Sequence, residues 1–208
     1  MSEARHAILA ALRASLADRP PVPDVPRRYR RAAPDGTDVV GRFAERVADY
    51  RADVRTVTAE GIPSAVWSIL ASIRARRVVV PDGVPHDWLV ADGVERVADS
   101  PPLSSADLDA IDAVLTGCAI AIAETGTIVL DGGPDQGRRA LTLVPDNHLC
   151  VVRADQIGDD VPAAIAALDP RRPLTWISGP SATSDIELRR VEGVHGPRHL
   201  FVLLVMRD

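Results

Sequence analysis

The richest group of potentially reactive side chains follows an apolar run near residue 175. In TWISGPSATSDIE (175–187), the apolar residues stop at a Gly-Pro pair, hydroxyl residues follow, and an acidic helix start comes next. Backbone N–H groups at a helix start, together with hydroxyls, can hold a carboxylate or a phosphate. Loops at the carboxyl ends of parallel strands are where such ligands usually bind. The predicted binding residues here are Gly179, Ser181, Thr183 and Asp185.

A purely structural interpretation of the same stretch is equally open. Ser184 and Glu187 have the spacing of a capping box, in which the serine accepts from the third helical N–H and the glutamate reaches back to the cap. Spacing alone does not separate ligand binding from loop and cap chemistry.

An acidic turn between two apolar segments is the second candidate. CAIAIA (118–123) and TIVL (127–130) flank Glu124, Thr125 and Gly126, which predicts two strands joined by a tight turn. A carboxylate there can act as general base, nucleophile or acceptor for substrate hydroxyls. The alternative is a turn residue that simply faces water. We predict Glu124 as catalytic and Thr125 and Gly126 as substrate-binding, with the turn interpretation open.

The third candidate is HGPRH (195–199), just before the last apolar run. His195 and His199 are four residues apart, but the intervening Gly-Pro breaks the helix that would align them, so no metal site is expected. We predict Arg198 as a substrate-binding carboxylate clamp and His195 as a catalytic residue that can donate or transfer a proton. His148 precedes the run LCVV in a similar way. A histidine at a strand edge also commonly has only a structural role.

Composition excludes several kinds of chemistry. All 24 basic residues other than histidine are arginines, so Schiff-base catalysis, a pyridoxal phosphate aldimine and a P-loop lysine are ruled out. The two cysteines, Cys118 and Cys150, lie in separate runs without a C-x-x-C motif. Neither a disulfide framework nor a thiolate-held zinc or iron–sulfur cluster is therefore expected in this chain.

Charge and hydropathy give expectations about partners and location. A net charge of −5 provides no general reason to bind nucleic acid. No apolar run is long enough to span a membrane, and the first twenty residues lack the pattern of a secretory signal. We therefore expect no nucleic-acid partner, no membrane span and a cytoplasmic location.

The apolar spacing predicts an α/β fold. Ile8, Leu12 and Leu16 indicate a first helix, and five prolines between 20 and 34 mark a linker. Helical and strand periods then alternate. Helices are expected near 39–50, 66–73, 104–111, 160–168 and from 185. Strands are expected at 54–58, 78–80, 94–97, 118–123, 127–130, 140–144, 149–152, 174–178 and 199–205.

Several of these strands are uniformly apolar, which is typical of a parallel sheet buried on both faces. We predict an open, largely parallel sheet covered by helices, with a mixed element near the acidic turn at 124. The expected organisation is an N-terminal helix and Pro-rich linker over 1–36 and one α/β domain over 37–208.

Four ordered motifs carry a resemblance to a known family. AIAETGTIVL, LTLVPDNHLCVV, SGPSATSDIE and GVHGPRHLFVLLV together resemble the LUD domain family of lactate utilization proteins, over most of residues 37–208. The resemblance implies a fold similar to the ribose-phosphate isomerase, glucosamine-phosphate deaminase and CoA-transferase group. It also implies a role in oxidising L-lactate to pyruvate, with iron–sulfur clusters carried by partner subunits and a small hydroxy- or oxo-acid as a possible ligand.

Two classes of function stay open. One is the cluster-free component of a lactate-oxidising system that depends on its partners. The other is a stand-alone isomerase- or transferase-type enzyme for a small anionic substrate, for which Glu124 invites comparison with the nucleophilic glutamate of CoA-transferases. The first is favoured, because oxidation requires a redox centre and the sequence has neither a cluster motif nor a GxGxxG fingerprint.

Overall fold

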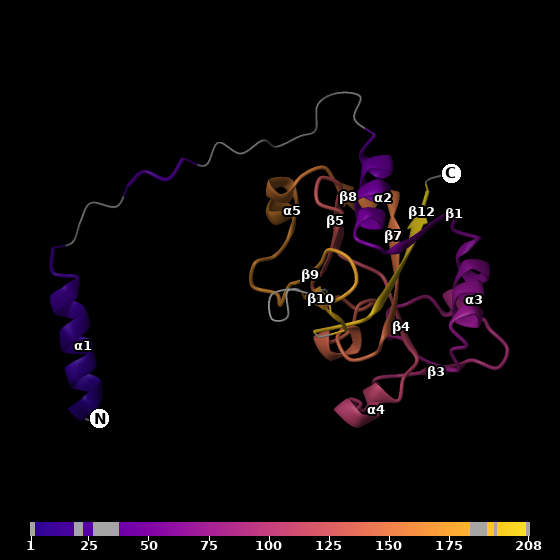
Figure 1. Cartoon of the computed structure of the whole chain (residues 1–208), viewed down its shortest axis with the longest axis horizontal. Coiled ribbons are helices and arrows are strands. Elements are labelled where there is room, and N and C mark those ends of the chain that lie inside the picture. Colours follow the sequence, from indigo (N-terminus) through magenta and orange to yellow (C-terminus); the bar gives the residue numbers. More distant parts are fainter. Residues whose placement is uncertain (1–2, 19–22, 27–37, 184–190, 194, 207–208) are drawn as a thin grey trace.

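A six-stranded parallel sheet forms the centre of the computed structural model, which describes residues 3–18, 23–26, 38–183, 191–193 and 195–206 (Figure 1). Its strands lie in the order β1-β12-β7-β4-β2-β3, and every neighbouring pair is parallel. Their bounds are β1 Asp53–Val57, β12 His199–Val205, β7 Asn147–Arg153, β4 Ala113–Thr116, β2 Arg77–Val79 and β3 Glu95–Val97.

A second, four-stranded sheet has mixed directions and the order β8-β5-β6-β9. β5 and β6 form an antiparallel hairpin, β9 adds to β6 antiparallel, and β8 adds to β5 in parallel. A short antiparallel pair, β10 with β11, follows β9. The bounds are β5 Ile120–Ile122, β6 Thr127–Leu130, β8 Ile157–Gly158, β9 Thr175–Ile177, β10 Ala182–Thr183 and β11 Val191–Glu192.

Helices connect and cover the sheets. Proline in the first turn suits the start of α3 and of α5, because its missing N–H would be unpaired there in any case. A full capping box begins α4. The bounds are α1 Glu3–Ser15, α2 Val39–Asp49, α3 Ile62–Ser72, α4 Ser105–Asp109 and α5 Val161–Ala167, with short 3-10 turns η1 His86–Trp88, η2 Arg139–Thr142 and η3 Ala154–Gln156.

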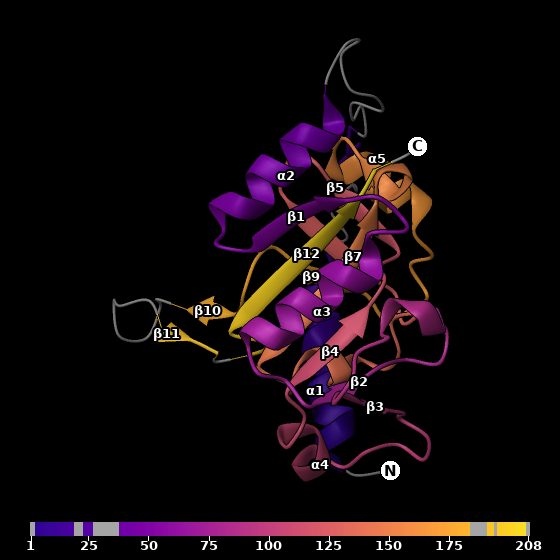
Figure 2. The same ribbon diagram turned by 90° about the vertical axis from the view of Figure 1, so that its right-hand side faces the viewer.

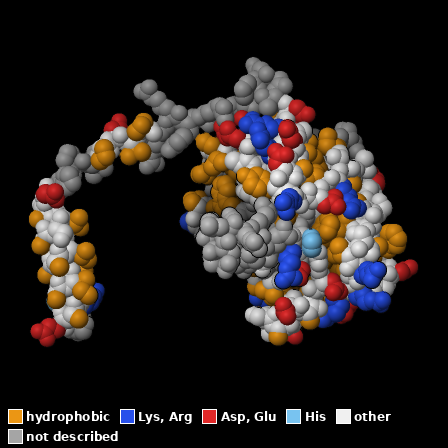
Figure 3. Space-filling view, in the orientation of Figure 1, with side chains coloured by type: hydrophobic (Ala, Val, Ile, Leu, Met, Phe, Trp, Pro, Cys, Tyr) orange, Lys and Arg blue, Asp and Glu red, His pale blue; other side chains and the backbone are white. Residues whose placement is uncertain are grey.

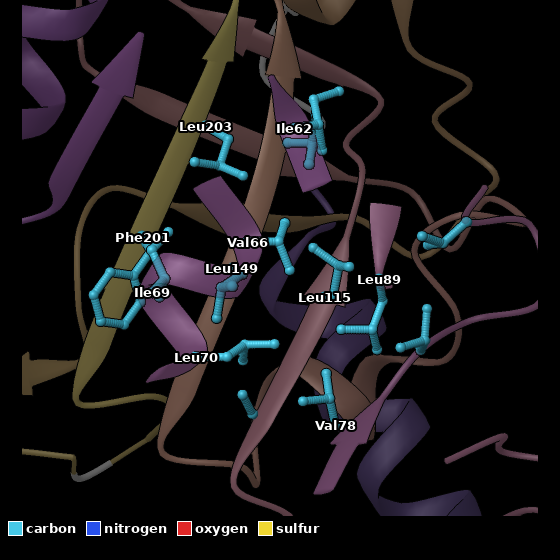
Figure 4. Packing of buried hydrophobic residues seen from close by; sticks show 14 of the residues in the cluster. Ile62, Val66, Ile69, Leu70, Val78, Leu89, Leu115, Leu149, Phe201 and Leu203 are labelled. Carbon is cyan, nitrogen blue, oxygen red and sulfur yellow. The ribbon is translucent and has the colours of Figure 1, made fainter. Parts of the chain in front are cut away.

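Helix α3 covers one face of the six-stranded sheet (Figure 2). Its buried side chains pack on alternate residues of the central strands, such as Leu149, Phe201 and Leu203, as Figure 4 shows. At roughly 2 kcal/mol for each fully buried aliphatic side chain, this layer is a major part of the folding free energy.

Helix α2 and the four-stranded sheet cover the opposite face. Phe43 and Val47 of α2 are fully buried in a second core with alternate residues of β7 and β12 and with residues of the β5-β6 hairpin. Side chains alternate across a strand, so β7 presents Leu149 to α3 and Cys150 to this second layer. The side chains of β7 that lie between the two sheets are therefore the alternate ones that include Cys150 and Val152.

The α/β expectation is confirmed, and the structure contains the parallel sheet and the mixed hairpin element. The strand expected at 140–144 is wrong, because that segment forms η2 and the turn after it. Both edges of β4 already pair with β2 and β7, so no strand position is free beside it. Leu141 instead packs on the sheet face near β2, β4 and α4. The helix expected from 185 lies outside the described residues.

Helix α1 is present as expected, and none of its residues is buried (Figure 3). Ile8, Leu12 and Leu16 are all more than half exposed. The division into 1–36 and 37–208 stays a prediction. Among the described residues, no helix combines the length and apolar character that crossing a membrane would need.

Candidate functional site

Two adjoining cavities open beside the four-stranded sheet. The smaller, of about 230 Å³, lies between the first residues of β7 and β12 on one side and β9 on the other, and we call it the inter-sheet cavity. The larger, of about 600 Å³, is walled mainly by the loop from Gly132 to Arg139. Arg139, Thr142 and Thr175 line both cavities. The inter-sheet cavity is lined by Arg139, Thr142, Leu143, His148, Thr175, Trp176, Ile177, Ser178, Gly179, Pro180, Ser181, His195, Gly196, Pro197 and Leu200.

His148 is the more deeply buried of two buried polar residues on the inter-sheet cavity wall, the other being Thr142. Only 1% of its surface is exposed, and its Nε2 lies 2.8 Å from Oγ1 of Thr116 on the neighbouring strand. The pairing of β4 with β7 sets this contact, because it places His148 opposite Val114 and Thr116 opposite Cys150. The imidazole is also hydrogen-bonded to the Cys150 thiol, so protein contacts fix the orientation of the ring.

A buried pair of thiols lies next to this histidine. Cys118 and Cys150 are both fully buried and free. A hydrogen bond from Cys118 lowers the pKa of Cys150 to about 6, with further contributions from His148 and Thr116. The same hydrogen bond and burial raise the pKa of Cys118. Each thiol also donates to an oxygen, Cys118 to the side chain of Gln156 at 3.6 Å and Cys150 to the carbonyl of Gly117 at 3.5 Å, and both lie in the core away from water.

Two adjacent arginines have very different surroundings. Arg138 donates to both carboxylate oxygens of Asp99, at 2.6 and 2.9 Å, and also to the carbonyl of Leu103. Arg139 lies on the walls of both cavities. Within the described part of the chain, the guanidinium of Arg139 makes no ion pair or hydrogen bond. It is thus a cation available to an anionic ligand in the cavity.

The loop after β9 and the loop before β12 are joined at the cavity mouth. The hydroxyl of Ser181 accepts from the backbone N–H of His195 at 3.0 Å, and the N–H of Ser181 donates to the carbonyl of Pro197 at 2.8 Å. Gly179 has a φ of +96°, and a Cβ there would come within 2.6 Å of Tyr50. Gly179, Ser181 and His195 therefore meet at one cavity, and the hydroxyl of Ser181 also has a structural role.

The expected position of this group, at the carboxyl ends of the parallel strands, is wrong. His195 precedes β12, and His148 lies at the start of β7, so the inter-sheet cavity is beside the amino ends of these strands. The strand before Ser181, β9, belongs to the second sheet and runs antiparallel to β6. The loop that follows β9 therefore lies at the end of the six-stranded sheet where β7 and β12 begin.

The acidic turn is not part of either cavity wall, so the structure does not bring Glu124, Thr125 and Gly126 together with the residues of the inter-sheet cavity. Glu124 lies 3.8 Å from Arg42 of α2. Gly126, with φ +59°, is pressed against the backbone of α2 at Arg46 and Val47. The turn connects to the cavity only through hydroxyls, since Thr125 contacts Thr127 and Thr127 contacts Ser178, each at 2.7 Å. The two β5-β6 strands direct this turn toward α2 and away from the 195–197 loop.

Arg198 also lies outside the cavity walls. Its guanidinium is 2.5 Å from the carboxylate of Asp146, and both side chains are about half exposed. The backbone of Thr183 is in β10, and Asp185 is outside the described residues.

Sequence reasoning overlooked Arg139 and Thr142 and gave His148 only a minor place. His148 and Cys150 are two residues apart in an apolar run, so they share one strand face, and this alternation was the available signal. Nothing in the sequence distinguishes Arg139 from Arg138. Among the described residues, no three histidine, cysteine or acidic side chains converge in a way that could hold a metal.

Comparison with known proteins decides the family. The LUD domain model matches residues 103–205. Lactate utilization protein C of Deinococcus radiodurans is 53% identical over 190 residues, which cover 89% of this chain and 85% of that protein. The chain belongs to the LUD domain family. Lactate utilization protein C of Geobacillus kaustophilus is more distant, at 24% identity over 96% of this chain and 92% of that protein.

A solved structure supports the fold as well. The crystal structure of a DUF162 family protein from Deinococcus radiodurans superposes with a TM-score of 0.69 and 48% sequence identity, over 81% of this chain and 96% of that chain. The matched LUD region runs from α4 through β12 and includes every residue that lines the inter-sheet cavity.

Proposed function

We propose that this chain is the cluster-free component of an L-lactate utilization system that oxidises L-lactate to pyruvate together with iron–sulfur partner proteins. The observation that carries the proposal is the 53% identity, over 89% of the chain, with a protein named lactate utilization protein C. At that identity and coverage the two chains share the family and the domain.

The need for partners rests on the redox balance. Conversion of a 2-hydroxy acid to a 2-oxo acid releases two electrons and two protons, and a redox cofactor must take up the electrons. An iron–sulfur cluster is usually held by four cysteine thiolates, and this chain has two cysteines. The electrons are therefore expected to pass to partner subunits, while this chain contributes binding or positioning.

An in-frame deletion of the gene tests the role. The deletion strain should grow normally on pyruvate and lose growth on L-lactate, and the wild-type gene supplied in trans should restore it. Equal growth of the deletion strain and its parent on L-lactate would contradict the proposal. Growth on pyruvate is the matched control, because it bypasses only the oxidation step.

A pull-down under anaerobic conditions tests the partners. The affinity-tagged chain expressed from its own locus should retain proteins that contain iron and acid-labile sulfide. Lactate-dependent reduction of a dye should appear in the recovered assembly and be absent from the chain alone. Turnover of lactate or of a CoA thioester by the isolated chain would instead favour the stand-alone enzyme.

A further inference from the structure

We infer that the inter-sheet cavity is a binding site for a small monocarboxylate with an oxygen on the carbon next to the carboxylate, with Arg139 as its carboxylate ligand. The site itself is argued from geometry, whereas the choice of lactate and pyruvate as probes rests on the proposed function.

The charge balance of the cavity supports a singly charged anion. Arg139 is a permanent cation without a partner among the described residues, and no aspartate or glutamate is among the residues that line the cavity. A guanidinium binds a carboxylate through two parallel hydrogen bonds. One arginine balances one negative charge, and a phosphate dianion would leave charge uncompensated in a partly enclosed space.

The backbone of Arg139, whose side chain is exposed, is held by its neighbours. The preceding residue, Arg138, is held by two hydrogen bonds to Asp99. The following turn, η2, is anchored by the buried side chains of Leu141 and Thr142, and Thr142 also donates to the carbonyl of Arg139 at 3.2 Å. The backbone at residue 139 is thus restrained on both sides, which reduces the entropy cost of holding a ligand there.

The remaining walls fit a small, partly apolar molecule. Leu143, Ile177 and Leu200 provide apolar surface. His148 and Ser178, which are held by Thr116 and Thr127, provide polar surface. His148 is held through Thr116 at 2.8 Å, so its ring has a fixed orientation. A volume of about 230 Å³ equals roughly eight water molecules at ~30 Å³ each, which suits a three- or four-carbon acid and is too small for a dinucleotide.

Trp176, which is 41% exposed on the cavity wall, provides a reporter. The full-length chain would be titrated with L-lactate, pyruvate, propionate and inorganic phosphate, with tryptophan fluorescence and calorimetry as readouts. We expect saturable binding of L-lactate or pyruvate, weaker binding of propionate and little binding of phosphate. Trp67→Phe, at an exposed position outside both cavity walls, should keep the fluorescence change and the calorimetric signal.

The decisive pair of variants is Arg139→Gln and Arg76→Gln. Arg76 is an exposed arginine just before β2 that lines neither the inter-sheet cavity nor the larger cavity beside it. Loss of a charge-assisted bidentate contact should weaken acid binding about tenfold or more in Arg139→Gln, and Arg76→Gln should bind as the wild type does. Thermal unfolding of both variants would verify that each is folded.

Several outcomes would overturn the inference. These are equal affinity in the two arginine variants, no saturable binding of either acid up to tens of millimolar, equal binding of propionate and lactate, or tighter binding of phosphate than of the acids. The growth experiment is independent of this one. If deletion abolishes growth on L-lactate while Arg139→Gln binds acids normally, the site fails and the proposed function stands. If the acids bind at Arg139 while deletion leaves growth unchanged, the function fails and the site stands.

Discussion

Arg138 and Asp99 form a two-pronged ion pair, at 2.6 and 2.9 Å, that joins the loop before η2 to the end of β3. The hydrogen bond from Arg138 lowers the pKa of Asp99, and the N–H of Leu103 lowers it further. The pair also raises the pKa of Arg138. This contact is local to the wall of the larger cavity and lies one residue from Arg139.

We predict that Asp99→Asn destabilises the protein by about 1.5–3 kcal/mol at neutral pH, because hydrogen bonds to a charged group are lost. A carboxylate whose pKa is lowered in the folded state stabilises it above the unfolded pKa of about 4, and this contribution is lost as the pH falls through the folded pKa. Urea unfolding should therefore show the two proteins converging below about pH 4. Asp92→Asn, at an exposed position, is the control and should have little effect.

The buried thiols Cys118 and Cys150 are expected to make the free energy of unfolding depend on pH on the neutral to alkaline side. Because the pKa of Cys150 is about 6 in the folded state and near 9 when unfolded, the unfolded chain binds the extra proton between these values. The free energy of unfolding should thus gain a contribution that rises with pH from 6 to 9 and is absent in Cys150→Ala. Cys118→Ala should lose the same rise, since it removes the main cause of the shift.

Val152→Ala is the matched control for this measurement, because it truncates a buried side chain on the same strand without removing an ionisable group. It should lower stability at every pH and keep the rise. Parallel pH profiles for the wild type and Cys150→Ala would contradict the prediction.

Gly126 is expected to be a packing requirement of the acidic turn. A Cβ there would lie 2.6 Å from a backbone carbon of Arg46 at φ +59°, whereas at Gly93, with φ +79°, no atom lies within 4 Å. Gly126→Ala should therefore cost about 2–5 kcal/mol and Gly93→Ala only about 1–2 kcal/mol. Equal losses of thermal stability in the two variants would show that α2 moves aside at little cost.

Ser181→Ala tests whether the Ser181 hydroxyl stabilises the loops at the cavity mouth or binds the ligand. Loss of the acceptor for the N–H of His195 should lower the free energy of unfolding by about 1 kcal/mol. Acid affinity should change less than in Arg139→Gln, because the Ser181 hydroxyl already has a protein partner. A variant with unchanged stability and lost affinity would instead assign Ser181 to the ligand. Calorimetry and chemical unfolding on the same preparation distinguish these cases.

The positions of helices and strands could be predicted from the sequence more accurately than the pairing between strands. Uniform burial along β7 and β12 follows from apolar runs, and the capping box at Ser104 and Asp107 is readable from two residues. The segment around Trp176 was correctly predicted as a strand, but period and composition carry no information on which strand it pairs with. Because β9 pairs antiparallel with β6, the Ser181 loop lies beside the amino ends of β7 and β12. The distinction between Arg138 and Arg139 likewise depends on where Asp99 lies in space.

The position of β12 has a consequence for biosynthesis. It lies between β1 and β7, and it is made last of the three. While residues 58–198 are being translated, β1 has no partner in the sheet and one edge of β7 stays open. At ~5–20 residues per second, this interval lasts on the order of ten seconds. During this time β1 and the open edge of β7 present unpaired backbone N–H and C=O groups, so the nascent chain is a predicted client of chaperones that bind unpaired strands.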